Sequence, residues 1–93
     1  MATFTFKRNK VGNWDVPITE IKYKKQVVGE IRHTSNGWKV YFHIAKGENF
    51  VNRSMKETFP TEELARETLK EKCSHIISNY KLYCPDNGSI VNE

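Results

Sequence analysis

The sequence predicts an α+β fold, in which a three- to four-stranded antiparallel sheet has one C-terminal α-helix packed on one face. Apolar and polar residues alternate with a period of two through residues 18–44, which is typical of strands with one dry face. After Pro60 the apolar residues recur every three or four positions, which is typical of an amphipathic helix. A one-sided sheet and an amphipathic helix can each cover the apolar side of the other.

The first segments of the chain predict two strands separated by a loop. Residues 3–8 alternate, with Phe4 and Phe6 on one side, and indicate a short strand. Residues 9–17 are expected to form a loop, because they are rich in Gly, Asn, Asp and Pro. Residues 18–24 alternate again and divide between the two faces of a second strand, with Thr19, Ile21 and Tyr23 inward and Glu20, Lys22 and Lys24 outward.

A third strand is predicted over residues 27–33, after a turn at residues 25–26. Gly29 inside this strand indicates a bulge or a close neighbour. The alternation places Val27 and Ile31 inward and Val28, Glu30 and Arg32 outward.

The clearest turn lies at residues 34–37, where Asn36 and Gly37 both tolerate the positive φ that two-residue hairpin loops require. The strand after it, residues 38–45, alternates most regularly. Its inward side chains are Trp38, Val40, Phe42 and Ile44, and its outward ones are Lys39, Tyr41 and His43. A second turn leads into residues 50–59, an irregular edge strand with a bulge, whose inward residues are Val51, Met55 and Phe59.

The helix is predicted to run for about 20 residues, from the N-cap Thr61 to near Lys81. Glu62 and Glu63 fill its first turn, where the helix dipole favours acids, and Glu62 with Arg66 forms an i,i+4 ion pair. The apolar stripe consists of Leu64, Ala65, Leu69, Cys73, Ile76, Ile77 and Tyr80. Residues 1–84 then form a single domain, and residues 85–93 form a flexible tail because Pro85 and Gly88 interrupt regular structure.

The composition indicates one small globular domain of the cytoplasm. The chain has 93 residues, of which 38% are hydrophobic and 28% charged. We expect neither a membrane-spanning segment, which needs roughly 20 apolar residues, nor a secretory signal. Cys73 and Cys84 are therefore expected to be buried free thiols.

Positive charge is concentrated in the first part of the chain. Residues 1–56 contain eleven Lys and Arg against four Asp and Glu, whereas residues 57–93 contain four against seven. The net charge is +4. A basic region of this kind favours polyanions or acidic protein surfaces as partners.

Catalytic and metal chemistry find little support in the sequence. The histidines are His33, His43 and His75, and no serine or cysteine is placed by a motif to pair with them. Cys73 and His75 would point apart on one helix, and no pair of ligands has a zinc spacing. We therefore expect a protein that is not an enzyme and has no metal and no cofactor.

The outer face of the predicted sheet is the candidate binding surface. Cationic side chains can neutralise phosphates, and an aromatic side chain among them can stack on a base. The alternative is an ordinary solvated face, which Glu20 and Glu30 would favour by interrupting the positive charge. The candidate residues on this face are Lys22, Lys24, Arg32, Lys39, Tyr41 and His43.

Three short motifs resemble the AP2-like DNA-binding domains, which include the arm-binding domains of phage-type integrases. The matching residues are Gly29-Glu30-Ile31-Arg32, Trp38-Lys39-Val40-Tyr41-Phe42, and the Phe59, Thr61, Glu63 and Ala65 of the helix start. The resemblance covers about half of the chain. It implies a three-stranded sheet that docks in the major groove and is followed by a helix, with Arg32, Lys39, Tyr41 and Arg53 on the DNA-contacting face.

Two hypotheses follow. The first is a small non-enzymatic domain that contacts double-stranded DNA through its basic sheet face. Its phosphate contacts would be Lys22, Lys24, Arg32 and Lys39, with Tyr41 and His43 near sugars or base edges. The second is a phage or mobile-element accessory protein that binds and modulates a host protein, through the same face or an edge strand. The chain would be a monomer or a weak homodimer.

Overall fold

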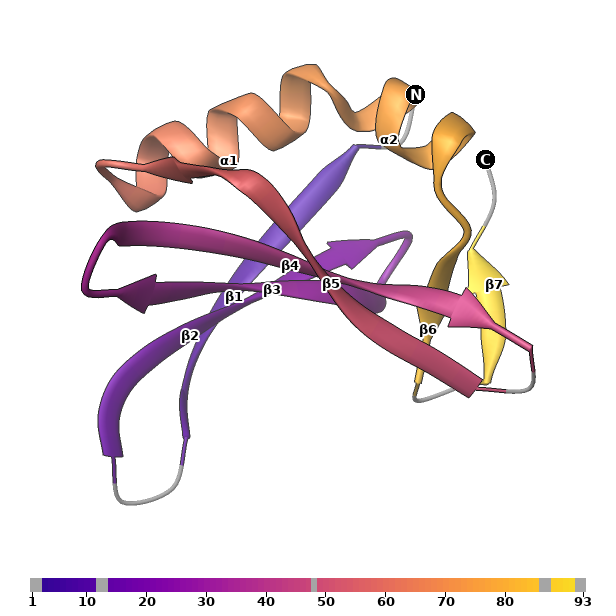
Figure 1. The fold of residues 1–93 in the computed structure, drawn as a ribbon, viewed down its shortest axis with the longest axis horizontal. Coiled ribbons are helices and arrows are strands. Elements are labelled where there is room, and N and C mark those ends of the chain that lie inside the picture. Colours follow the sequence, from indigo (N-terminus) through magenta and orange to yellow (C-terminus); the bar gives the residue numbers. More distant parts are fainter. Residues whose placement is uncertain (1–2, 12–13, 48, 86–87, 92–93) are drawn as a thin grey trace.

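The structure, a computed structural model, describes residues 3–11, 14–47, 49–85 and 88–91, and it is α+β as predicted. Within these ranges its antiparallel sheet has seven strands, and two short helices lie along one side of it (Figure 1). The prediction of three or four strands and one helix is therefore wrong in detail. Residues 9–11 and 14–17, from the segment that the composition assigned to a loop, lengthen the first two strands, and the C-terminal region adds two short strands.

Five strands follow one another as an antiparallel meander, each paired with the next along the chain. These strands are β1 (Phe4–Val11), β2 (Trp14–Tyr23), β3 (Gln26–Thr34), β4 (Gly37–Lys46) and β5 (Asn49–Phe59). Pairing between β1 and β2 thus places residues 9–11 and 14–17 in strands, although their composition predicts a loop.

Both hairpin turns lie one residue earlier than predicted. Lys24 and Lys25 occupy the β2–β3 turn with φ of 51° and 68°. In the β3–β4 turn, Ser35 and Asn36 form the loop and Gly37 takes the positive φ, 124°. Thr34 stabilises this turn, because its Oγ1 donates to the Gly37 carbonyl at 2.9 Å and accepts from the Asn36 N–H at 3.2 Å.

The predicted single helix is two helices, α1 (Glu62–Glu71) and α2 (Cys73–Asn79), separated at Lys72. Lys72 has φ −94° and ψ 8°, but its N–H still donates to the Thr68 carbonyl at 3.0 Å. The apolar stripe therefore continues across the break through Ala65, Leu69, Cys73, Ile76 and Ile77, which are all buried. Its two ends are exceptions, since Leu64 and Tyr80 are more than 40% exposed.

Two short strands complete the sheet after the helices. β6 (Leu82–Cys84) pairs with β4 at Ile44, and β7 (Ser89–Val91) pairs with β6, so the predicted loose tail contains a strand. Ile44 also pairs with β5, so β6 must occupy the other edge of β4. On that edge the β3 pairing ends at Phe42, and β6 takes the place of β3 beyond it.

The core lies between the sheet and the helices. Phe4, Ile21, Ile31, Val40 and Leu69 are fully buried there. Two face assignments from the sequence are wrong, because Val28, predicted to face outward, is fully buried, and Val27, predicted to face inward, is opposite the outward residue Lys22. The register between β2 and β3 shifts between Ile21 and Lys22, and this bulge changes which face the first residues of β3 occupy.

Gly29 next to this bulge allows β3 and β4 to approach closely, as its position in the strand predicted. A Cβ atom at Gly29 would lie 2.3 Å from the backbone oxygen of Tyr41. The two cysteines, Cys73 and Cys84, are buried thiols that form no disulfide with each other, as expected.

Candidate nucleic-acid interface

The candidate interface is the side of the sheet opposite the helices, called here the outer face. The strand register brings its side chains into rows that cross the sheet. One row runs across all five strands of the meander through Lys7, Glu20, Glu30, Tyr41 and Ser54. The adjacent row contains Arg32, Lys39 and Thr58. The structure therefore brings Arg32, Lys39 and Tyr41 together, as the sequence predicted.

Arg32 is held by two side-chain contacts on the outer face. Its Nη2 donates to Glu30 Oε1 at 2.5 Å, and its guanidinium lies 5.2 Å from the centre of the Tyr41 ring. The ion pair offsets the charge of Arg32, but the two contacts also hold its planar group over the sheet. A guanidinium held in this way is suited to phosphate, which it can bind with two parallel hydrogen bonds.

Two lysines share the outer face with Arg32, one beside it and the other beyond the row that contains Glu20 and Glu30. Lys39 is opposite Arg32 on β4, and Lys22 lies on β2 opposite Val27. Both are half-buried, so their aliphatic stems pack on the sheet. Glu20 and Glu30 face each other across β2 and β3 and reduce the positive potential between these lysines, as the sequence indicated.

His43 belongs to a separate aromatic group at the far end of the outer face. Its Nδ1 lies 2.6 Å from Asn52 Oδ1, and its ring meets Phe50 edge-on with centroids 5.1 Å apart. Phe50 in turn stacks on Tyr83 of β6, at 5.2 Å. The sequence did not indicate Phe50 or Tyr83, because one lies in an irregular segment and the other in a strand of three residues.

Lys24 and Arg53 do not join the other candidates on the outer face. Lys24 lies in the β2–β3 turn, with its Nζ 5.5 Å from the centre of the Tyr23 ring. Arg53 pairs with Phe42, an inward residue, and is therefore on the helix side of the sheet. The period of two explains this placement, since Arg53 lies between Val51 and Met55 in the same alternation.

Arg53 instead lines a groove on the helix side, between β5 and α2. The groove has a volume of about 370 Å³. Its apolar lining residues are Phe42, Ile44, Met55 and Ile76. Its charged or polar lining residues are Arg53, Ser54, Lys56, Glu57, Lys72, His75 and Tyr80. The sequence did not indicate this groove, because its two walls come from separate elements.

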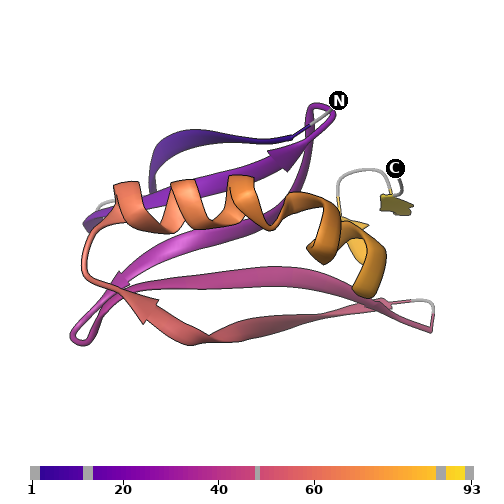
Figure 2. The same cartoon turned by 90° about the horizontal axis from the view of Figure 1, so that it is seen from above.

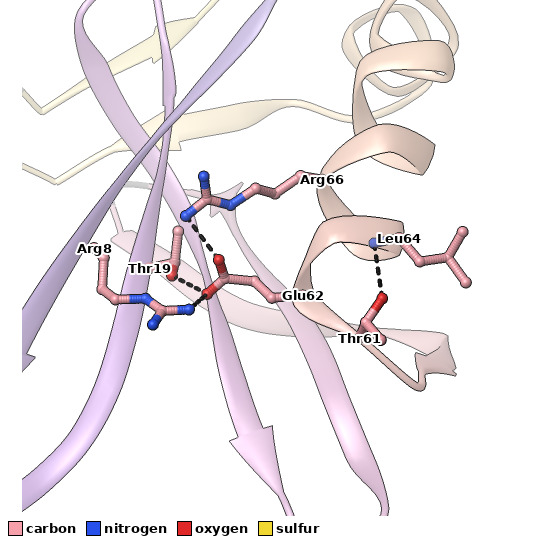
Figure 3. Close-up of polar contacts among 6 residues, drawn as sticks. All are labelled: Arg8, Thr19, Thr61, Glu62, Leu64 and Arg66. Atoms are coloured by element: carbon pink, nitrogen blue, oxygen red, sulfur yellow. Dashed lines mark hydrogen bonds and ion pairs between the residues drawn. The ribbon is translucent and has the colours of Figure 1, made fainter.

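A polar cluster joins the start of α1 to the first two strands (Figure 3). Glu62 Oε1 accepts hydrogen bonds from Arg8 at 2.7 Å and from the buried Thr19 hydroxyl at 2.6 Å. Its Oε2 pairs with Arg66 at 2.7 Å, which confirms the predicted i,i+4 pair. Thr61 caps the same helix by accepting the Leu64 N–H at 3.1 Å.

The pKa of Glu62 is lowered below its ordinary value of 4.5. Burial alone would raise this pKa, but the hydrogen bonds from Thr19 and Arg8 and the positive charges of Arg66 and Arg8 together outweigh it. The cluster is thus a structural anchor for α1, and the sequence revealed its Arg66 contact but not those to Arg8 and Thr19.

Comparisons with protein families, with curated proteins and with solved structures found no match to this chain. Among the residues that the structure describes, no three His, Cys, Asp or Glu side chains come together in a group that could hold a metal ion. Neither α1 nor α2 nor any other helix within the described ranges is long and apolar enough to span a membrane.

Proposed function

We propose that this chain is a small non-enzymatic domain that binds double-stranded DNA through the outer face of its sheet. The observation that carries the proposal is the group of two cations and one aromatic ring, Arg32, Lys39 and Tyr41, on the side of the sheet opposite the helices. In this proposal Lys22, Arg32 and Lys39 contact phosphates, and Tyr41 packs on a sugar or a base edge.

The order of elements also supports the proposal. Strands β3, β4 and β5 are followed by α1, which is the arrangement that the resemblance to AP2-like domains implies. Ala65, which matches the alanine of that pattern, is fully buried beneath the sheet. The major groove admits a two-stranded ribbon, and in this proposal β3 and β4, which carry Arg32, Lys39 and Tyr41, enter it.

The charges indicate a modest, salt-dependent affinity. Three or four neutralised phosphates correspond to a slope of about −2.7 to −3.6 in log K against log salt. Affinity should then fall roughly 40- to 150-fold between about 50 and 200 mM salt. The carboxylates of Glu20 and Glu30 oppose binding, and Glu30 must share Arg32 with the phosphate.

The test is fluorescence anisotropy of a labelled random-sequence duplex with the variant Arg32→Ala, Lys39→Ala. The matched control is Lys70→Ala, Lys81→Ala, which removes two cations from α1 and from the residue before β6. We expect the outer-face variant to lose most of its affinity and the control to lose little. Equal binding by both variants would refute the assignment of this face.

The second candidate is an accessory protein that binds a host protein. The basic outer face would then meet an acidic protein surface, and Lys22 and Lys39 would increase the association rate more than the final affinity. Duplex binding that is absent at low salt, together with capture of a protein from nuclease-treated lysate by the parent but not by the outer-face variant, would favour this candidate.

A further inference from the structure

We propose a second binding site on the helix side of the sheet, where the groove between β5 and α2 takes an extended acidic segment of a partner protein. Figure 2 shows the helices lying over the middle of the sheet, with β5 to one side of them. The groove occupies the space between them, with Met55 and Ile76 on its two walls. This site lies on the side of the sheet opposite the outer face, so the inference does not depend on DNA binding.

The floor of the groove is suited to an apolar side chain. Phe42 and Ile76 are buried at 5% and 3% exposure, whereas Ile44 and Met55 are only partly buried against the core. A volume of about 370 Å³ is at the small end of ligand pockets and has room for one or two side chains. Methionine adapts its shape to different occupants, which favours a site that accepts a segment of variable sequence.

The charges around this floor favour an acidic occupant. Arg53, Lys56 and Lys72 contribute three positive charges, against the single carboxylate of Glu57. Glu57 Oε1 is 3.7 Å from Lys72 Nζ, and both side chains are about half exposed, so this pair is weak. Asp or Glu residues on either side of an apolar residue would complement this arrangement.

The backbone of β5 can hold such a segment in an extended conformation. In the described part of the chain β5 pairs with β4 alone, so its other edge is available for a further strand. Its residues 49–54 keep a regular register with β4, and the irregularity begins only after Ser54. When the partner segment adds as a strand to β5, every second side chain of that segment lies on the helix side of the sheet, toward the groove. Val51, which is 43% exposed on this side, would be covered as well.

A protein segment fits these features better than nucleic acid does. Phosphates would satisfy the cations, but a nucleic-acid backbone has no side chain that fills the floor at Met55 and Ile76 and no strand edge that pairs with β5. The combination of an apolar floor, a cationic border and an open strand edge therefore points to an acidic peptide.

The probe for the test is a blocked heptapeptide in which glutamate alternates with valine and leucine. Its control is the same peptide with lysine in place of glutamate. Amide and methionine methyl shifts are followed during titration of the labelled protein. We expect shifts in residues 49–57 and 72–80 and at the Met55 methyl with the glutamate peptide, and no comparable shifts with the lysine peptide.

The decisive variant is Arg53→Glu, Lys72→Glu, which reverses two exposed charges at the groove. It should weaken binding of the glutamate peptide about tenfold or more and should permit binding of the lysine peptide. The matched control Lys22→Glu, Lys39→Glu reverses two charges on the outer face and should leave glutamate-peptide binding unchanged.

Four results would overturn the proposal. The first is the absence of shifts at millimolar glutamate peptide, and the second is equal binding of both peptides. The third is a set of peptide-induced shifts confined to the outer face. The fourth is a set of shifts at the groove when duplex DNA is added instead of peptide. Unchanged amide spectra of the free variants would show that the substitutions preserve the fold.

Discussion

Replacement of Glu62 by glutamine should destabilise the domain by about 2 kcal/mol, because this carboxylate joins α1 to the sheet. The amide has only one oxygen, so it cannot accept from both Thr19 and Arg66. The largest contribution comes from Thr19, whose fully buried hydroxyl loses its acceptor when this oxygen turns to Arg66, a loss of roughly 1–3 kcal/mol. The ion pairs with Arg8 and Arg66 add less, about 0.3–1 kcal/mol each, because these side chains are 52% and 34% exposed and can regain water. The amide that replaces the carboxylate would recover part of this loss by accepting one hydrogen bond.

The matched control is Glu63→Gln, which removes a charge from the same helical turn. Glu63 is exposed, so this variant measures the loss of the favourable interaction with the helix dipole, about 0.3–1 kcal/mol. Thermal unfolding followed by circular dichroism should show a Tm lower by roughly 8–16 °C for Glu62→Gln, at about 4–8 °C per kcal/mol for a domain of this size. Similar Tm values for the two variants would refute the anchoring role.

The same comparison has a defined pH dependence. The pKa of Glu62 is lowered in the folded state, so its carboxylate stabilises the fold fully above its ordinary value of 4.5. This contribution is lost as the pH falls below that value and through the lowered pKa. The stability difference between the parent and Glu62→Gln should therefore be constant near neutral pH and shrink in acid. A difference that persists undiminished to about pH 2 would contradict the reasoning.

Two further predictions concern the backbone. Gly29→Ala should destabilise the fold by about 2–3 kcal/mol or more, because the new Cβ would lie 2.3 Å from the backbone oxygen of Tyr41 and β3 and β4 would have to separate. Urea unfolding measures this loss of stability. A loss below about 0.5 kcal/mol would show that the strands adjust freely. Thr61→Ala should lower the free energy of unfolding by about 1 kcal/mol, because it removes the acceptor of the Leu64 N–H. Thr61→Ser should be nearly neutral in the same assay, because serine keeps the capping hydroxyl. Equal losses of stability for both variants would argue against the cap.

The parts of the fold that could be predicted are those determined by local pattern. The alternation from Trp38 to Ile44 correctly identified the central strand, because one face of that strand is dry and the period of two is strict. The change of period after Pro60 and the capping hydroxyl of Thr61 located the helix start, because both signals act within a few residues.

The parts that could not be predicted depend on pairing with another segment. The segment from Trp14 to Pro17 belongs to β2 because it pairs with Lys10 and Val11 at the end of β1, whereas its composition alone indicates a loop. β6 has only three residues, which are too few for a hydrophobic period to be recognised. It is a strand because it pairs with the edge of β4. Val28 was assigned to the wrong face because a bulge shifts the register without any change in hydrophobicity.

The candidate interface shows the same limit. Its central group of Arg32, Lys39 and Tyr41 follows from alternation and was predicted correctly as one surface. Arg53 was placed there by resemblance, whereas its own alternation with Val51 and Met55 assigns it to the helix side. Side-chain contacts between distant elements, such as Arg8 with Glu62, have no sequence signal in a single chain.

The exchange of β3 for β6 beside β4 affects how the chain assembles. Each of the first five strands pairs with the strand next to it in the sequence. Such pairing closes only a short loop, so it can form rapidly during folding. The pairing of Leu82 with Ile44 instead joins segments separated by β5 and both helices, so it requires a long loop and should form late. Before that step, the Ala45 N–H that later donates to the Lys81 carbonyl is an unpaired group on the central strand. The C-terminal strands are thus a closing element, and their detachment would briefly expose a pairing edge in the middle of the sheet.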